Sequence, residues 1–323
     1  MKTYRMRLVP KTAFGTPLLG ETLFGCLCWA LRRKSGNERL SQLLSGYTEG
    51  RPFAVVSDAF PAGFVPLPAL PDVYWVASPG DDRKYLKKKT WVGFDALNTS
   101  VSLWRNRAMT DADIARVLSG DCSDESIGLI SKVTAVHNTI NRRTLTTGTG
   151  PFAPYEQQQI WFNPALTLDV YVVTDEARIS LEEIVSALID VGTIGFGRDA
   201  SVGLGKFELI GTPTEMTPRE ASASCMALSS VVLSGLSEIV SEKTFYRVKT
   251  HFGRHGSELV VRGQPFKKPI LLARSGAVIT FKNPSSEPFV GKGLDGLSTV
   301  LPETVHQGYA PVLSLPEEGN CHE

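Results

Sequence analysis

The sequence predicts an α+β protein, and three observations support this fold class. Two segments have apolar residues at helical spacing. Each of them is flanked by two segments whose alternating pattern or composition is typical of β-strands. A long, polar and irregular stretch separates the second strand from the third. The resulting order is strand-helix-strand, insertion, strand-helix-strand, which is the ferredoxin-like (RRM-like) arrangement. The four predicted strands are Tyr4–Val9, Phe53–Ser57, Leu166–Thr174 and Lys206–Ile210.

The first half of this arrangement is predicted from alternation and from a helix-start signal. Tyr4–Val9 alternates polar and apolar residues, as a half-buried strand does. After a turn over Pro10–Gly15, Thr16 and Pro17 place a capping residue before a proline, a common helix start. Leucines at positions 19, 23, 27 and 31 continue the helix, and we expect Gly36 to end it after three basic residues.

The second half is predicted from a capping box and an apolar stripe. Ser180 and Glu183 have the capping-box spacing, and apolar residues at positions 181, 184, 185, 188 and 189 follow at helical intervals. Gly192 is expected to stop this helix. The loop that leads to the fourth strand, Gly192–Phe207, has five glycines within fourteen residues.

This glycine-rich loop has two interpretations. Glycine permits positive φ and lets a ligand approach the main chain closely, and successive exposed N–H groups can hold an anion such as phosphate. The alternative is a flexible connection without a ligand. Gly195–Ala200 also matches a dinucleotide-binding pattern, but that pattern needs a strand before it and a helix after it. The order here is reversed, so we reject the dinucleotide interpretation.

The insertion contains a basic and aromatic segment, Arg83–Arg107. It has seven basic residues against one acid, with tyrosine, phenylalanine and two tryptophans interleaved. Cations neutralise phosphates and aromatic rings stack on bases, so this composition favours single-stranded nucleic acid. The alternative is a solvated surface flap.

The predicted topology brings three connections to one end of the sheet. With right-handed crossovers, these are the turn Pro10–Gly15, the insertion and the glycine loop. The basic and aromatic segment is therefore expected to meet the glycine loop in space. This convergence favours the nucleic-acid interpretation.

Two domains are expected from length and composition. The first spans residues 1–215 and includes an inserted thumb at about 75–160, which we expect to contain a long β-hairpin with Lys132–Thr149 as one arm. The second, residues 222–323, is predicted to be smaller and either ferredoxin-like or β-rich, with strand candidates joined by glycine-rich turns. His251 and His255 are four residues apart, but Gly253 and Gly256 argue against a helix there, so we expect no metal pair.

Composition excludes several classes of protein. The 323 residues are 42% hydrophobic and 21% charged, with a net charge of +1, so any nucleic-acid site must be a local patch. No apolar run is long enough for a membrane span. Five cysteines without a CxxC pair indicate a reducing, cytoplasmic environment. No Walker loop, GxSxG, HExxH or zinc-type cysteine cluster is present, so neither a cofactor nor a metal is predicted.

The glycine loop, in a ferredoxin-like context and ending Gly-x-Gly-Lys-Phe, resembles that of the RAMP superfamily of CRISPR-associated proteins. Within this superfamily, the chain resembles the capping subunit, the fourth subunit, of type III-A (Csm) effector complexes. The stretches that resemble this family are Phe14–Gly25, Ser57–Pro61, Val136–Thr144, Gly195–Glu208 and Val305–Val312.

The resemblance implies a non-catalytic role in antiviral defence, in which the chain grips the 5′ handle of the CRISPR RNA and caps the backbone filament. It implies contacts with the large Cas-ten-type subunit and with the backbone RAMP subunit, and no membrane. The implied RNA contacts are Lys11, Thr12, Phe14, Gly15 and Thr16 in the first turn, His137, Asn138, Ile140, Arg142, Arg143 and Thr144 in the hairpin, and Gly195, Gly197, Arg198, Ser201, Gly203, Gly205 and Lys206 in the glycine loop.

Two other functions stay open at this point. One is a RAMP-type endoribonuclease that processes CRISPR repeat RNA, with His137 as the general base and Arg142 or a lysine at the scissile phosphate. A lone histidine is more often structural, and no second histidine lies nearby in the sequence. The other is an enzyme that binds a small phosphorylated ligand with the glycine loop.

Overall fold

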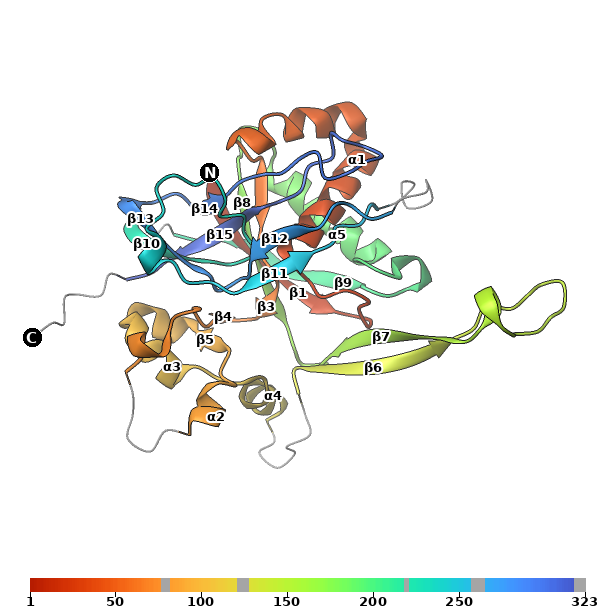
Figure 1. Cartoon of the computed structure of the whole chain (residues 1–323), viewed down its shortest axis with the longest axis horizontal. Helices are drawn as coiled ribbons and strands as arrows, with labels where there is room; N and C mark the ends of the chain where they lie inside the picture. The colour runs from red at the N-terminus through yellow and green to blue at the C-terminus, as the bar shows by residue number, and fades with distance from the viewer. Residues whose placement is uncertain (77–81, 121–127, 218–220, 257–264, 317–323) are drawn as a thin grey trace, which may run out of the picture.

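The central element of the computed structural model is an antiparallel sheet with the order β2-β8-β1-β9 (Figure 1). The structure describes residues 1–76, 82–120, 128–217, 221–256 and 265–316. The strands are β1 (Lys2–Pro10), β2 (Ala54–Val56), β8 (Leu168–Thr174) and β9 (Phe207–Glu215), and the short β3 (Phe60–Pro61) also pairs with β8. All four predicted strands are therefore present.

Two helices, α1 (Gly20–Leu44) and α5 (Leu181–Ile194), pack against each other and cover one face of this sheet. Tyr4, Met6 and Leu8 point into the core that they share, as the alternation of β1 predicts. The capping box of α5 is confirmed: Ser180 and Glu183 each accept a hydrogen bond from the other's backbone N–H.

The predicted start of α1 was wrong, whereas the predicted stop at Gly36 is confirmed as a break between two helical stretches. The helix begins at Gly20, whose N–H donates to the Asp58 carboxylate at 2.7 Å, and the Thr16 hydroxyl accepts a hydrogen bond from Arg198 N instead of capping the helix. At Gly36 the backbone turns to φ +85°, which breaks the helical path, but a further helical stretch continues to Leu44.

The insertion between β3 and β8 has a folded part and a projecting hairpin. The folded part contains β4 (Phe64–Pro66), β5 (Trp91–Gly93), α2 (Arg83–Leu86), α3 (Trp104–Arg107) and α4 (Asp111–Ser119). The hairpin, β6 (Ile130–His137) paired with β7 (Tyr155–Phe162), extends away from the body of the molecule (Figure 1). The predicted arm Lys132–Thr149 is thus strand only to His137. Short 3₁₀ turns lie within the insertion at Asp72–Tyr74, Phe94–Asn98, Val101–Leu103 and Gly150–Phe152, and elsewhere in the described chain at Tyr47–Glu49, Ala200–Val202 and Ser241–Lys243.

The C-terminal part forms a second antiparallel sheet and a two-stranded ribbon. The sheet has the order β13-β10-β15-β14, and the ribbon pairs β11 with β12. Gln307 is fully buried and exchanges two hydrogen bonds of 2.8 Å with the backbone of Val56, which joins this part to the edge of the central sheet. The bounds are β10 Ser222–Ala227, β11 Val248–His251, β12 Ile270–Ala273, β13 Val278–Ser285, β14 Phe289–Gly291 and β15 Tyr309–Ser314.

The fold is therefore mixed α/β with several antiparallel sheets. Within the described residues, no helix has both the length and the apolar character needed to cross a membrane. Residues 77–81 and 121–127 of the predicted thumb, and 257–264 and 317–323 of the predicted second domain, lie outside the described residues.

Candidate nucleic-acid interface

Three segments meet at one end of the central sheet, and we call them the loop cluster: Lys11–Thr16, Gly195–Lys206 and Gln158–Phe162 at the end of β7. Lys11 N donates to the carbonyl of Lys206, and Gly205 N donates to that of Ala13, both at 2.8 Å. Phe14 and Ile160 exchange two backbone hydrogen bonds, also of 2.8 Å. The first turn and the glycine loop thus meet as predicted, and the insertion contributes the base of its hairpin.

Phe14 holds these three segments together from inside. Its side chain is fully buried, with Phe162 of β7 edge-on at 5.2 Å between ring centroids and Phe196 of the glycine loop at 6.1 Å. Phe14 therefore organises the loop cluster and does not line its surface. Gln158, Ile160 and Phe162 were not predicted to take part, although the β-propensity of the stretch 155–162 could have indicated the second hairpin arm.

Gly15 and Gly205 of the loop cluster serve the protein's own packing. Gly205 has φ +75°, and a Cβ there would lie 2.2 Å from the carbonyl oxygen of Phe196. A Cβ on Gly15 would lie 2.6 Å from the carbonyl oxygen of Arg198. The sequence led us to expect close approach by a ligand, but at these two positions the approaching atoms belong to the chain itself.

Arg198 anchors the glycine loop to the hairpin. Its N–H donates to the Thr16 hydroxyl at 3.0 Å, and its Nη2 donates to the carbonyl of Gln158 at 2.6 Å. Nε also lies 3.1 Å from a carboxylate oxygen of Asp199, close enough for an ion pair although the geometry is not that of a hydrogen bond. The guanidinium is half-buried and already engaged, so its main role in this structure is to hold the two segments together.

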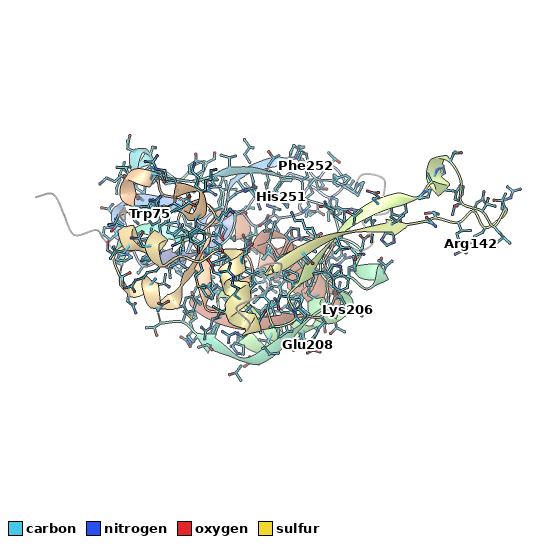
Figure 2. The ribbon with its side chains drawn as sticks, turned by 90° about the horizontal axis from the view of Figure 1, so that it is seen from below. Trp75, Arg142, Lys206, Glu208, His251 and Phe252 are labelled. Atoms are coloured by element: carbon cyan, nitrogen blue, oxygen red, sulfur yellow. The ribbon has the colours of Figure 1, made fainter. Side chains whose placement is uncertain are left out.

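The exposed face of the loop cluster carries basic and hydroxyl side chains, together with the apolar side chains of Val202 and Trp161. Lys206 and Ser201 are exposed, and Lys206 lies close to the base of the hairpin (Figure 2). Lys206 N donates to the Thr12 hydroxyl at 3.0 Å, which fixes the backbone beside that lysine. Lys11 is exposed too and pairs with Glu208 at 2.8 Å. Gly203 has nothing within 4 Å of its Cβ position, so the loop is open to solvent there.

The hairpin ends in an exposed basic tip. Arg142 lies at its far end (Figure 2), and Asn138, Ile140, Arg143 and Thr144 are also exposed. A turn orders this tip, because Leu145 N donates to the carbonyl of Asn141 at 2.7 Å and Arg143 N donates to its side chain at 3.0 Å.

His137 lies where the paired strands end. Its ring stacks on that of Tyr155 with a centroid distance of 5.7 Å and an angle of 22° between the planes. Its Nε2 is covered and has no hydrogen-bond partner among the described residues. The side chain is therefore packed against a neighbour, and within the described part of the chain it has neither an ion pair with an acid nor a ring contact with a second histidine.

The basic and aromatic segment 83–107 does not form the surface expected of it. Trp104 is fully buried in a core with Phe60 and Tyr171, and the Trp91 indole N–H donates to Asp111. The expectation of aromatic faces open to bases was wrong for these tryptophans, because the segment needs them for its own core. The expectation that this segment meets the glycine loop was wrong as well: α2 and α3 lie across the molecule from the loop cluster (Figures 1 and 2).

A separate group of titratable side chains is buried at the start of α1. The carboxylate of Glu21 accepts a hydrogen bond from Lys249 at 2.6 Å and lies 3.5 Å from His251 Nδ1. Burial, reinforced by the charge of Glu21, raises the pKa of Asp58 to about 7. Burial, reinforced by neighbouring positive charges, lowers the pKa of His306 to about 3. Within the described residues, no group of three or more histidine, cysteine or acidic side chains has a geometry that could hold a metal ion.

Comparisons with known proteins agree with this architecture. No protein-family model and no curated protein matches the chain. Solved structures do match, and they indicate one class of fold: the chain is similar in fold to a subunit of type III CRISPR complexes.

Within that class, the fold is similar to Csm4. One match is in a Csm3–Csm4 subcomplex of a type III-A interference complex, with a TM-score of 0.60 and 15% identity over 97% of this chain and 100% of the other. Csm1–Csm4 cassettes with AMPPNP and with pppApA give TM-scores of 0.57 and 0.56 at 17% and 18% identity, over 98% of this chain and 100% of theirs. The resemblance predicted from the sequence is therefore confirmed at the level of the fold.

Proposed function

We propose that this chain is a non-catalytic, RNA-binding subunit of a type III CRISPR effector complex that grips the 5′ handle of the guide RNA and caps the backbone filament. The observation that supports this most is the loop cluster, where the first turn, the glycine loop and the hairpin base meet beside exposed Lys206. Single-stranded RNA is recognised by contacts to its phosphates and to splayed bases, which needs a polar, basic surface with projecting elements.

Two further features support the proposal. The strand order β2-β8-β1-β9, with two helices on one face, favours assigning the central sheet to the ferredoxin-like arrangement. The matched structures contain Csm1 or Csm3 beside Csm4. By analogy, we assign a large Cas-ten-type subunit and a backbone RAMP subunit as the protein partners of this chain.

A non-catalytic role is favoured by the state of His137. A general base must reach the hydroxyl whose proton it removes. The His137 ring is stacked on Tyr155 and its Nε2 is covered. We therefore assign His137 to the packing of the hairpin.

The role of the hairpin tip in RNA binding can be tested directly. Replacing Arg142 and Arg143 by alanine is expected to weaken binding of repeat-handle RNA and to lower the salt dependence of log K by about 0.7 for each phosphate that is no longer neutralised. The double variant Lys87→Ala/Lys88→Ala is the matched control, because it removes two exposed cations from the segment across the molecule. Fluorescence anisotropy over a salt series measures the RNA affinity and its salt dependence for each variant. Equal weakening in the two variants would contradict an interface at the hairpin.

The absence of catalysis needs a separate experiment. Repeat RNA incubated with the protein in EDTA is expected to stay intact. Metal-independent cleavage that disappears in His137→Ala would show the endoribonuclease instead. Tight binding of a mononucleotide, with no RNA binding, would favour the small-molecule enzyme.

A further inference from the structure

A row of basic residues follows the outer face of β1. Tyr4, Met6 and Leu8 point into the core, so Arg5, Arg7 and Val9 lie on the opposite face of the sheet. The pairing with β9 continues one step beyond the strand, since Lys11 N donates to the carbonyl of Lys206. Lys11 therefore extends the same row, which runs from the loop cluster back along the sheet.

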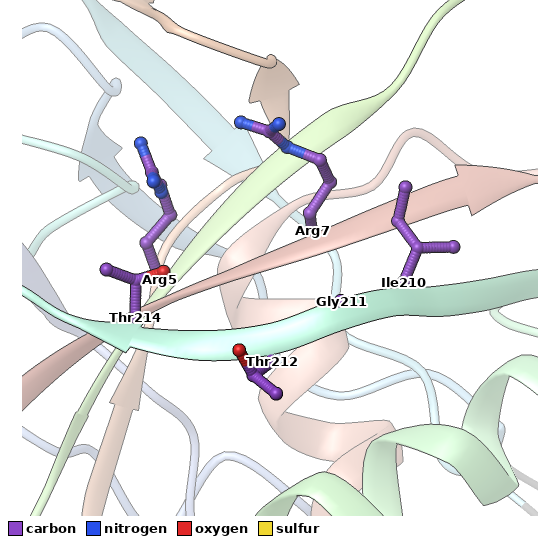
Figure 3. Close-up of a pocket in the computed structure, with 6 residues that line it drawn as sticks. All are labelled: Arg5, Arg7, Ile210, Gly211, Thr212 and Thr214. Atoms are coloured by element: carbon purple, nitrogen blue, oxygen red, sulfur yellow. The ribbon is translucent and has the colours of Figure 1, made fainter.

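A cavity of about 220 Å³ lies at the far end of this row. Its lining comes from neighbouring strands, and Figure 3 shows Arg5 and Arg7 projecting from β1 on the same side of the sheet. Arg5 pairs with Thr214 and Arg7 with Ile210, so β9 has three residues where β1 has one, and the strand bulges between them. The bulge contributes to the lining, which is Arg5, Arg7, Ile210, Gly211, Thr212 and Thr214.

The two arginines differ in how they are held. Nε and Nη2 of Arg7 donate to the two oxygens of Asp169 at 2.8 and 3.2 Å, and Asp169 is fully buried. This fork fixes the plane of the Arg7 guanidinium. Among the described residues, Arg5 has no acidic partner within ion-pair distance, and its guanidinium lies over the ring of Phe94 at 5.8 Å. The cavity thus has one immobilised cation and one cation without a counter-charge.

We propose that Arg5, Arg7 and the Thr214 hydroxyl bind a backbone phosphate of the same RNA strand that contacts the loop cluster. This inference rests on the proposed function. Guanidinium groups match the oxygens of a phosphate, and a threonine hydroxyl supplies a further donor. From Lys11 to Arg5 is six residues of strand, or about 20 Å at roughly 3.3 Å per residue. An RNA that occupies both places must span that distance.

An RNA phosphate is favoured over a free nucleotide by the surroundings of the cavity. Gly211, Thr212 and Thr214 are not buried, so the cavity is a depression on the sheet surface. Sites for small molecules bury most of their ligand. A phosphate within an extended strand needs only a local contact, and the row of β1 residues leads from it to the loop cluster.

The test uses Arg5→Gln, with Thr214→Val as a second variant that removes only the hydroxyl. Arg7 is left intact, because removing it would leave Asp169 as a buried charge without a partner. RNAs of increasing length are bound to the full chain over a salt series. For long RNAs, we expect Arg5→Gln to weaken binding roughly tenfold and to lower the salt slope by about 0.7. RNAs too short to span from the loop cluster to the cavity should show no difference. Arg33→Gln, on the helix that covers the other face, is the matched control.

The outcomes separate the inference from the function on which it rests. Unchanged binding in Arg5→Gln and Thr214→Val, with weaker binding in the Arg142/Arg143 variant, overturns the phosphate site and leaves the proposed function standing. Failure of the wild-type chain to bind any RNA overturns the proposed function. Binding of ATP or inorganic phosphate that disappears in Arg5→Gln, without a length-dependent effect on RNA, shows a free-anion site and also overturns the inference.

Discussion

Gly203 and Gly205 lie two residues apart in the glycine loop and have different physical constraints. Both have positive φ, +96° and +75°, which disfavours any residue with a side chain. Only Gly205 also faces backbone, with the carbonyl oxygen of Phe196 at 2.2 Å from the Cβ position, whereas Gly203 faces open space. An alanine at position 203 would therefore meet backbone strain alone, whereas an alanine at position 205 would meet both backbone strain and a steric clash.

We expect Gly203→Ala to lower the free energy of unfolding by about 1 kcal/mol, the usual cost of a left-handed alanine. Gly205→Ala should cost clearly more, because the loop must move away from Phe196. Urea unfolding of the two variants measures the difference. Equal destabilisation would mean that the loop relaxes freely around residue 205.

Predictions from neighbouring residues in the sequence were correct where short-range contacts define the structure, and wrong where distant residues do. The alternation in β1 and the capping box at Ser180 lie within a few residues of the elements they define, and both were correct. The helix start at Thr16 was wrong because Asp58, 38 residues from Gly20, accepts the first helical N–H. Trp104 looked available for stacking, and its burial depends on partners far away in the sequence. In the loop cluster, Gln158 contributes a backbone carbonyl, which no side-chain motif could indicate.

At the scale of elements, the hairpin is joined to the body of the molecule by few contacts. The Phe14–Ile160 backbone pair and the Arg198–Gln158 bond lie at its base, and the strands beyond them are largely exposed. Arg198 is the side chain that connects this base to the glycine loop. The orientation of the hairpin therefore depends on two anchors, Phe14 and Arg198, of which Arg198 bonds both Gln158 and Thr16.

Arg198→Lys keeps the charge but loses the planar fork. In the free protein, we expect faster hydrogen exchange of the amides near residues 158–162, with little change in the melting temperature. Arg143→Lys at the exposed tip is the control and should leave this exchange unchanged. Unaltered protection in Arg198→Lys would show that Phe14 alone fixes the hairpin.

At the scale of the whole molecule, the two halves of the chain share buried polar contacts. Gln307 completes the edge of the central sheet, and Lys249 and His251 of the C-terminal ribbon approach Glu21 of α1. Asp58 and His306 have pKa values shifted in opposite directions by burial. The raised pKa of Asp58 favours the folded state below about pH 4, and this contribution is lost as the pH rises through about 7. The lowered pKa of His306 favours folding above about pH 6.5, and this is lost as the pH falls toward about 3.

These opposite signs give a prediction for two variants. Relative to wild type, Asp58→Asn should gain stability as the pH rises from about 4 to about 7. His306→Gln should lose relative stability as the pH rises from about 3 to about 6.5. Denaturant unfolding across this range tests both, and parallel trends in the two variants would contradict the assignment.

The eight-residue ladder of β6 and β7 connects the loop cluster at its base to the hairpin tip, the two places where we propose that RNA binds. At about 3.3 Å per residue, the paired strands are roughly 26 Å long. A ligand held at both the hairpin tip and the loop cluster rebinds at one end while the other is still attached, at an effective concentration on the order of millimolar. Residence time then depends on the stiffness of the hairpin as much as on the strength of either contact. A ligand too short to reach both ends loses this advantage entirely.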